Sequence, residues 1–151
     1  MVNNLFTPFS LACLAIAVAA LVSNVALVAM RYSGLPEEVP AHYGFFGRPD
    51  RWGSKAIMWL YALLPALTLL LMAGPMITML TTPHKETDLN RVRVSFRLFA
   101  AMAAYLSVGT LVITTRAIAV AEKQADGLGR MVAPLFVAGL MLITVLFLLP
   151  L

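Results

Sequence analysis

The feature that most constrains this sequence is a set of four long apolar runs separated by polar connections. A helix that crosses a bilayer needs roughly 20 predominantly apolar residues. Hydrophobic residues make up 61% of the chain and charged residues 12%, about half of the roughly 25% that soluble domains carry. The sequence therefore predicts an all-α integral membrane protein, a four-helix transmembrane bundle, with helices over about 8–30, 56–80, 93–121 and 131–151.

Little chain remains outside these four helices, so the sequence predicts a single membrane domain over residues 1–151. The second and third connections are short, which favours antiparallel neighbours in a bundle. The formal net charge is +4, but the basic residues lie in the connections and at the helix ends, where such side chains contact lipid headgroups. We expect the lipid bilayer as a partner and no nucleic acid, because no water-soluble basic face is left to bind it.

Small and polar residues inside the apolar runs are expected to pack helices together. Ala15, Ala19 and Ser23 follow one another at four-residue spacing, a stripe that lets another helix approach closely. Asn24 lies beside this stripe, and we expect it to hydrogen-bond a neighbouring helix. Hydroxyl groups in the third run are expected to bond carbonyls of their own helix, so they need no ligand.

Residues that start and stop helices are also present. Ser54 comes just before the second apolar run and is the predicted N-cap of that helix. Asp88 is the predicted cap of the third helix, where a carboxylate would meet unpaired N–H groups. Gly127 and Gly129 suit the left-handed C-terminal position of the third helix and the turn beyond it.

The longest polar stretch, residues 31–55, separates the first two helices and is called the polar segment below. It holds three of the nine prolines, which restrict the backbone, and glycines that permit tight turns. Its aromatic residues suit the headgroup level or the end of a helix bundle; they are Tyr43, Phe45, Phe46 and Trp52. We therefore predict a compact, ordered polar loop rather than a flexible linker.

The chemistry of the polar segment points away from catalysis. Glu37, Glu38, His42 and Asp50 are possible metal ligands, but their spacing matches no established zinc or calcium template. The lone cysteine, Cys13, lies within the first apolar run, and no nucleophile, base and orienting acid can be placed together. The sequence thus predicts a non-enzymatic protein without a metal or cofactor.

Opposite charges are crowded within the polar segment, beside a low-dielectric layer that favours ion pairing. We expect at least one of its acids, Asp50 first, to pair with Arg48, Arg51 or Lys55. The alternative is that each charge is fully solvated, as many surface charges are.

A spaced motif runs through the polar segment. It consists of Leu35-Pro36, Pro40, His42, Gly47, Asp50 and Trp52-Gly53-Ser54-Lys55. This motif resembles the signature L-P-x-x-[IV]-P-x-H-x-x-x-x-G-x-x-D-x-[WYF]-G-S-K of a domain of unknown function found at the start of SdpI-type membrane proteins, which are longer than this chain. The resemblance implies a multi-pass protein of the bacterial inner membrane and, by extension, immunity against a secreted peptide toxin.

The leading hypothesis is a membrane binding protein whose recognition surface is residues 35–55. In this hypothesis His42, Asp50, Trp52 and Lys55 contact the partner or ligand. The opposing interpretation is that these four residues only fold the loop and start the second helix.

Two other classes of function remain open from the sequence. One is a structural accessory subunit of a larger membrane complex, suggested by the small-residue stripe and by a fourth helix without ionisable side chains. The other is a small transporter, suggested by the Gly74-Pro75 pair within the second helix and by Arg116 near the end of the third.

Overall fold

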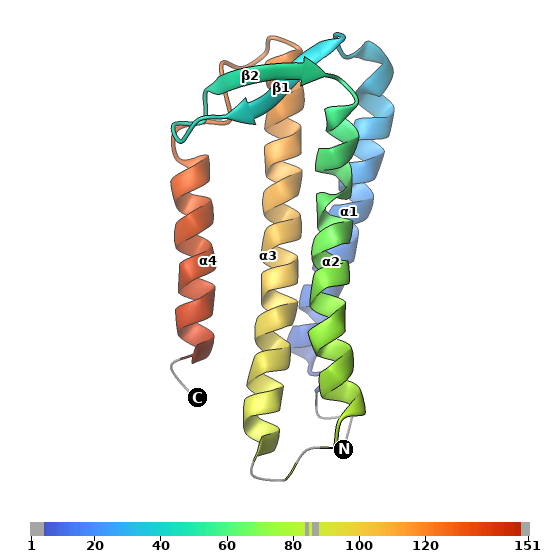
Figure 1. Ribbon diagram of the computed structural model, residues 1–151, viewed down its shortest axis with the longest axis vertical. Helices are drawn as coiled ribbons and strands as arrows, with labels where there is room; N and C mark the ends of the chain where they lie inside the picture. The colour runs from blue at the N-terminus through green and yellow to red at the C-terminus, as the bar shows by residue number, and fades with distance from the viewer. Residues whose placement is uncertain (1–4, 84, 86–87, 149–151) are drawn as a thin grey trace.

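The computed structural model describes residues 5–83, 85 and 88–148. The chain is mostly helical, and the helices are α1 (Pro8–Arg31), α2 (Ile57–Thr81), α3 (Leu89–Ala121) and α4 (Val132–Leu148). Between α1 and α2 lie a short 3₁₀ turn, η2 (Tyr32–Gly34), and two strands, β1 (Glu38–Tyr43) and β2 (Pro49–Ser54) (Figure 1).

Three of the helices are long and apolar enough to cross a membrane. They are α1 with η2, at 27 residues, α2 at 25 and α3 at 33. The described part of α4 is shorter, at 17 residues, and equally apolar in character. The end of the predicted 131–151 helix, residues 149–151, lies outside the described residues. These lengths indicate a membrane protein with three candidate spans and a shorter apolar helix.

The polar segment corrects the all-α prediction, because its strands pair as an antiparallel hairpin, Glu38–Ser54. The hairpin lies across one end of the helices, and reaches from the start of α2 to the start of α4 (Figure 1). The prolines and glycines of the polar segment favour a loop. A two-stranded ribbon also accommodates proline, because each strand has a free edge on which a missing N–H costs no ladder hydrogen bond.

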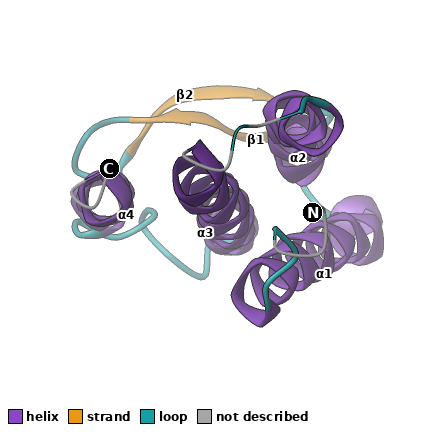
Figure 2. Cartoon of the chain, turned by 90° about the horizontal axis from the view of Figure 1, so that it is seen from below, coloured by secondary structure: helices purple, strands orange, loops and turns teal. Residues whose placement is uncertain are grey.

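Helices α1, α2 and α3 pack together, with the most extensive contact between α1 and α3. Figure 2 shows α3 standing between the α1–α2 pair and α4. The buried face of α1 is formed by Ala17, Ala20, Asn24 and Val28. Their spacing of three or four residues defines one side of a helix. Small side chains on that side allow the close approach of α3.

The stripe predicted to pack α1 against another helix therefore does not lie on the side of α1 that packs against α2 and α3. Ala15, Ala19 and Ser23 are all exposed, because the helix turns its neighbouring face, with Asn24, toward the other helices. The expectation for Asn24 itself is confirmed: its Nδ2 donates to the carbonyl of Tyr61 in α2 at 2.9 Å. One polar side chain thus joins α1 to α2 inside the apolar region.

Predicted helix caps are only partly correct. Helix α2 begins after Ala56, not Ser54, and the Ser54 hydroxyl accepts a weak 3.4 Å bond from the Ala56 N–H. Asp88 holds the N-cap position of α3, but its side chain makes no capping bond within the described chain. The unpredicted cap is at α1, where Thr7 and Ser10 form a reciprocal capping box.

Helix α3 ends at the predicted residue, but other residues than predicted stop it. The helix stops at Ala121, and Lys123 takes the left-handed conformation with φ 58°. The Lys123 N–H donates to the Val120 carbonyl and the Gln124 N–H to the Ala119 carbonyl, the pair of bonds that defines a Schellman motif. Gly127 and Gly129 are therefore not needed to end the helix.

Rings inserted over glycines join α4 to α3. A Cβ atom at Gly109 would overlap the ring of Phe136, and one at Gly139 would overlap the ring and hydroxyl of Tyr105. The two rings stack with centroids 5.3 Å apart. The Tyr105 hydroxyl donates to the carbonyls of Leu135 and Phe136 at 3.1 and 3.0 Å.

This joint predicts that Gly139→Ala destabilises the docking of α4. The added methyl must displace Tyr105 and break its hydrogen bond, at a cost of about 1–3 kcal/mol, as for overpacked cores. Gly74→Ala in α2 is the matched control, because a Cβ there meets nothing within 4 Å. Thermal unfolding in detergent should show a lower Tm for Gly139→Ala alone; equal Tm values for the two variants would contradict the joint.

Candidate functional site

The hairpin end of the molecule collects the polar groups that the sequence singled out. Strand β1 pairs with β2 through Glu38 opposite Ser54, Val39 opposite Gly53 and Pro40 opposite Trp52. Val39 and Pro40 are buried, and Val39 belongs to a hydrophobic cluster with residues of α1, α2 and α3. Burial of a valine side chain stabilises by roughly 1.5–3 kcal/mol, so this part of the hairpin is anchored on the helices.

Two irregularities in the ladder create the central polar contact. The pairing passes from Pro40–Trp52 to His42–Arg51 and then to Tyr43–Pro49. Ala41 in β1 and Asp50 in β2 are thus the extra, bulged residues, and bulges re-aim side chains. The Asp50 carboxylate Oδ1 lies 2.6 Å from Nδ1 of His42.

The other bulged residue ties the hairpin to α2. A bulge leaves a backbone group without a ladder partner, and the Ala41 carbonyl accepts a 2.9 Å bond from the Tyr61 hydroxyl. Tyr43 packs in the same half-buried layer, where burial and then the nearby Tyr61 raise the pKa of its hydroxyl. The tyrosine hydroxyl of Tyr43 is therefore held in a layer that disfavours a charged group.

Lys55 forms the second ion pair of the hairpin. Its Nζ lies 2.8 Å from Oε1 of Glu37 and 5.5 Å from the centre of the Tyr32 ring. The hydrogen bond to Glu37 raises the pKa of Lys55. The expectation that an acid of the polar segment pairs with a base is confirmed here, but Asp50 pairs with His42 rather than with Arg48, Arg51 or Lys55.

Glu37→Gln is therefore expected to lower the pKa of Lys55. A raised folded-state pKa means that the pair stabilises the fold fully below the unfolded lysine pKa, and that this contribution is lost as pH rises through the folded value, above 10.5. The measurement is an NMR titration of labelled lysine side chains. Lys85 and Lys123, the other two lysines, are internal controls, and an unchanged Lys55 titration would contradict the pair.

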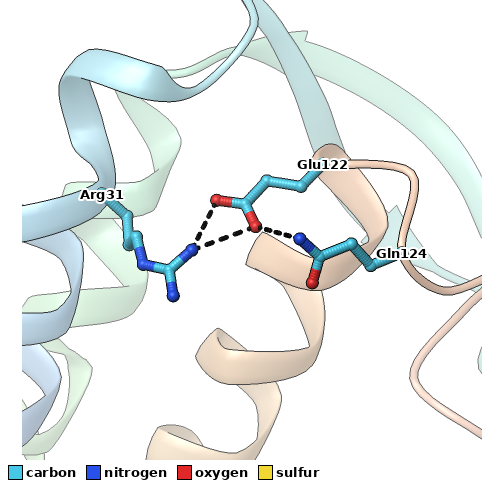
Figure 3. Close-up of polar contacts among 3 residues, drawn as sticks. All are labelled: Arg31, Glu122 and Gln124. Carbon is cyan, nitrogen blue, oxygen red and sulfur yellow. Dashed lines mark hydrogen bonds and ion pairs between the residues drawn. The ribbon is translucent and has the colours of Figure 1, made fainter.

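A contact between the ends of α1 and α3 was not predicted from the sequence. Arg31 Nη1 lies 3.1 Å from Oε1 and 3.2 Å from Oε2 of Glu122, and Gln124 Nε2 donates to the same carboxylate at 3.0 Å (Figure 3). Both helices end here, so the Arg31 cation also lies near the negative end of the α1 dipole. The sequence signal is only opposite charge at two helix ends, which specifies no pairing.

A second contact missed from the sequence joins the hairpin turn to the α3–α4 connection. Gly47 has φ +75°, and a Cβ on it would lie 2.6 Å from the Gly129 carbonyl oxygen. A Cβ on Gly127 would overlap the Gly47 carbonyl oxygen, which accepts a 2.8 Å bond from the Leu128 N–H. We call this backbone contact of Gly47, Gly127, Leu128 and Gly129 the glycine clasp. It needs glycines because the two backbones touch without intervening side chains.

Gly127→Ala is expected to open the glycine clasp. A methyl group there must push the Gly47 backbone away and break the Leu128 hydrogen bond, at a cost of roughly 1–3 kcal/mol. Gly34→Ala is the control, since a Cβ at Gly34 meets nothing within 4 Å. Hydrogen exchange of the Leu128 amide should become faster in Gly127→Ala and stay unchanged in the control. Unchanged exchange in both variants would show that the glycine clasp does not hold the two segments together.

The structure places all four predicted site residues on or directly after the hairpin. It brings His42 and Asp50 together, with side chains 64% and 52% exposed. Trp52 lies opposite Pro40 and is 51% exposed. Lys55 follows β2 and is engaged with Glu37 rather than with the other three. Within the described residues, no group of three or more His, Cys, Asp and Glu side chains lies together in a form that could hold a metal ion.

Comparison with known proteins places a domain over this region. Residues 11–69 match the family described as a domain of unknown function (DUF1648), a stretch that runs from α1 through the hairpin into α2. An uncharacterized protein of Archaeoglobus fulgidus is 34% identical over 82 residues, which are 54% of this chain and 40% of that protein. The chain thus spans less than half of that relative's length. No solved structure matches the chain.

Proposed function

We propose that this protein is a non-enzymatic binding protein of the bacterial inner membrane, of the SdpI type, and that residues 35–55 recognise a secreted peptide toxin. The domain match over residues 11–69 supports the proposal because it includes all of residues 35–55, which carry the signature motif. Apolar helices of spanning length support a multi-pass membrane location.

The observation that carries the proposal is the exposure of three signature side chains. His42, Asp50 and Trp52 each expose half or more of their surface. An exposed ion pair contributes little to stability, typically about 0–1 kcal/mol, so His42 and Asp50 do not serve mainly to hold the fold. An exposed tryptophan beside polar groups is a common anchor of protein interfaces.

The proposal predicts that alanine at His42, Asp50 or Trp52 abolishes protection without unfolding the protein. The assay is survival of sensitive bacteria that express each variant and are challenged with a peptide toxin that SdpI-type proteins neutralise. Toxin affinity should fall on the order of tenfold or more, the effect of losing about 1.4 kcal/mol of binding, and survival should fall with it. Arg51→Ala is the matched control, because Arg51 is exposed on the same strand and is not part of the signature.

Two results would refute this proposal. If the variants lose thermal stability in step with protection, the hairpin is scaffold and does not recognise a toxin. If the unmodified protein neither protects cells nor binds labelled toxin in lipid nanodiscs, immunity is not its function.

A structural accessory subunit is the second candidate, favoured by the exposed stripe of Ala15, Ala19 and Ser23 on α1. Small residues on a lipid-facing side would let a helix of another protein approach closely. Purification in mild detergent would then recover stoichiometric partners, and Ala19→Leu would release them. The transporter hypothesis gains no support, because α2 runs unbroken through Gly74-Pro75.

A further inference from the structure

An open cleft lies between the hairpin turn and the segment that leads into α4. Its volume is about 430 Å³, and it is lined by Phe46, Arg48 and Arg130. Figure 1 shows the turn of the hairpin beside the start of α4. Arg48 follows the hairpin turn and Arg130 precedes α4, so two distant parts of the chain supply the two guanidinium groups.

The glycine clasp fixes the backbone on both sides of this cleft. Gly47 directly precedes Arg48, and Gly129 directly precedes Arg130. The Leu128 N–H bond to the Gly47 carbonyl lies between these two positions. The two arginines are therefore held near one another by rigid backbone rather than by chance contact of long side chains.

Two cationic side chains line the cleft. Within the described residues, neither Arg48 nor Arg130 forms an ion pair with a carboxylate, whereas Arg31 pairs with Glu122 and Lys55 with Glu37. Like charges that converge on one cleft repel each other and attract an anion.

The surroundings indicate which anion fits. Arginine presents a planar fork of donors that matches phosphate oxygens. Arg130, which lines the cleft, precedes α4 by two residues, and Met131 and Leu135 at the start of that apolar helix are exposed. Phe45 and Phe46 are 68% and 69% exposed at the hairpin turn, and aromatic side chains favour the headgroup layer of a membrane.

We propose that this cleft binds the phosphate of an anionic phospholipid, with Arg48 and Arg130 on the phosphate and the acyl chains along the exposed face of α4. A free phosphate would contact only the two guanidinium groups, whereas a lipid also places its acyl chains against the exposed Met131 and Leu135. The apolar surface beside the cleft therefore favours a lipid over a soluble phosphate. The site uses none of His42, Asp50, Trp52 and Lys55, although Phe46 and Arg48 lie within residues 35–55. Lipid binding is measured without toxin, so its failure and the failure of the proposed function are distinguishable.

The test is lipid binding to the purified full chain in detergent, measured by native mass spectrometry with phosphatidylglycerol and phosphatidylcholine as probes. The unmodified protein should bind phosphatidylglycerol on the order of tenfold more tightly. Arg48→Gln with Arg130→Gln should remove that preference, because the two guanidinium groups supply the positive charge that favours the lipid of net negative charge over the zwitterionic one. Arg51→Gln removes the same charge from β2 and should retain the preference.

Further arms separate the sources of phosphate and the effects of folding. Glycerol phosphate at the same concentration should not displace the lipid; displacement would overturn the lipid assignment in favour of a soluble phosphate. An equal loss in Arg51→Gln would overturn the site in favour of diffuse attraction to a basic surface. If the double variant fails to fold, Arg48→Lys and Arg130→Lys keep the charge but lose the fork, and an undiminished preference in both would refute the arginine site.

Discussion

The arrangement of the helices and the hairpin depends on one constraint: the hydrocarbon of a bilayer offers no hydrogen-bond partner to the backbone. Inside a bilayer every backbone N–H and C=O must be satisfied within the protein, and a helix does this by itself. Two polar side chains in α3 follow the same constraint, since Thr110 and Thr114 donate to the carbonyls of Leu106 and Thr110. The buried Ser107 hydroxyl, expected to do the same, has no hydrogen-bond partner within the described residues. Within the described residues, non-helical backbone is confined to the ends of the helices, and the hairpin, the glycine clasp and the ion pairs of Arg31, His42 and Lys55 occur together at one end.

This concentration at one end links the matched domain to the rest of the chain. Residues 11–69 contain most of α1, the hairpin and half of α2. Arg31 joins this region to Glu122 at the end of α3, and Gly47 joins it to Gly127 and Gly129 before α4. The α3–α4 half is therefore not a separate unit: its connecting segment completes the surface that the hairpin begins.

Much of the helical structure could be predicted from the sequence, because a long apolar run has few alternatives to a helix. Predicted and observed bounds of α1 and α2 differ by one residue. Helix α3 starts earlier than predicted, at Leu89, because long basic side chains at a helix end extend away from the apolar layer without ending the helix. The side of α1 that packs was mispredicted, since small residues occur on more than one face and only the positions of α2 and α3 select one.

The hairpin and its contacts could not be predicted for a different reason. Proline and glycine spacing is compatible with a loop or with a bulged ribbon, and a one-residue bulge changes which side chains meet. Asp50 faces His42 rather than a neighbouring arginine because Asp50 is itself the bulged residue. Gly127 and Gly129 looked like a helix stop because their true partner, Gly47, is remote in sequence, and local patterns carry no information about such a pairing.

The structure also divides the signature segment into two parts with different physical roles. Leu35, Val39 and Pro40 are buried, and Gly47 touches the α3–α4 connection. These residues are sufficient to order the hairpin, because burial and close backbone contact contribute most of the stabilisation available to a short ribbon. His42, Asp50 and Trp52 add exposed groups, whose pairing and packing contribute far less. A fold can therefore keep its hairpin while these exposed residues change, and the surface they form is the part of the segment on which binding specificity can act.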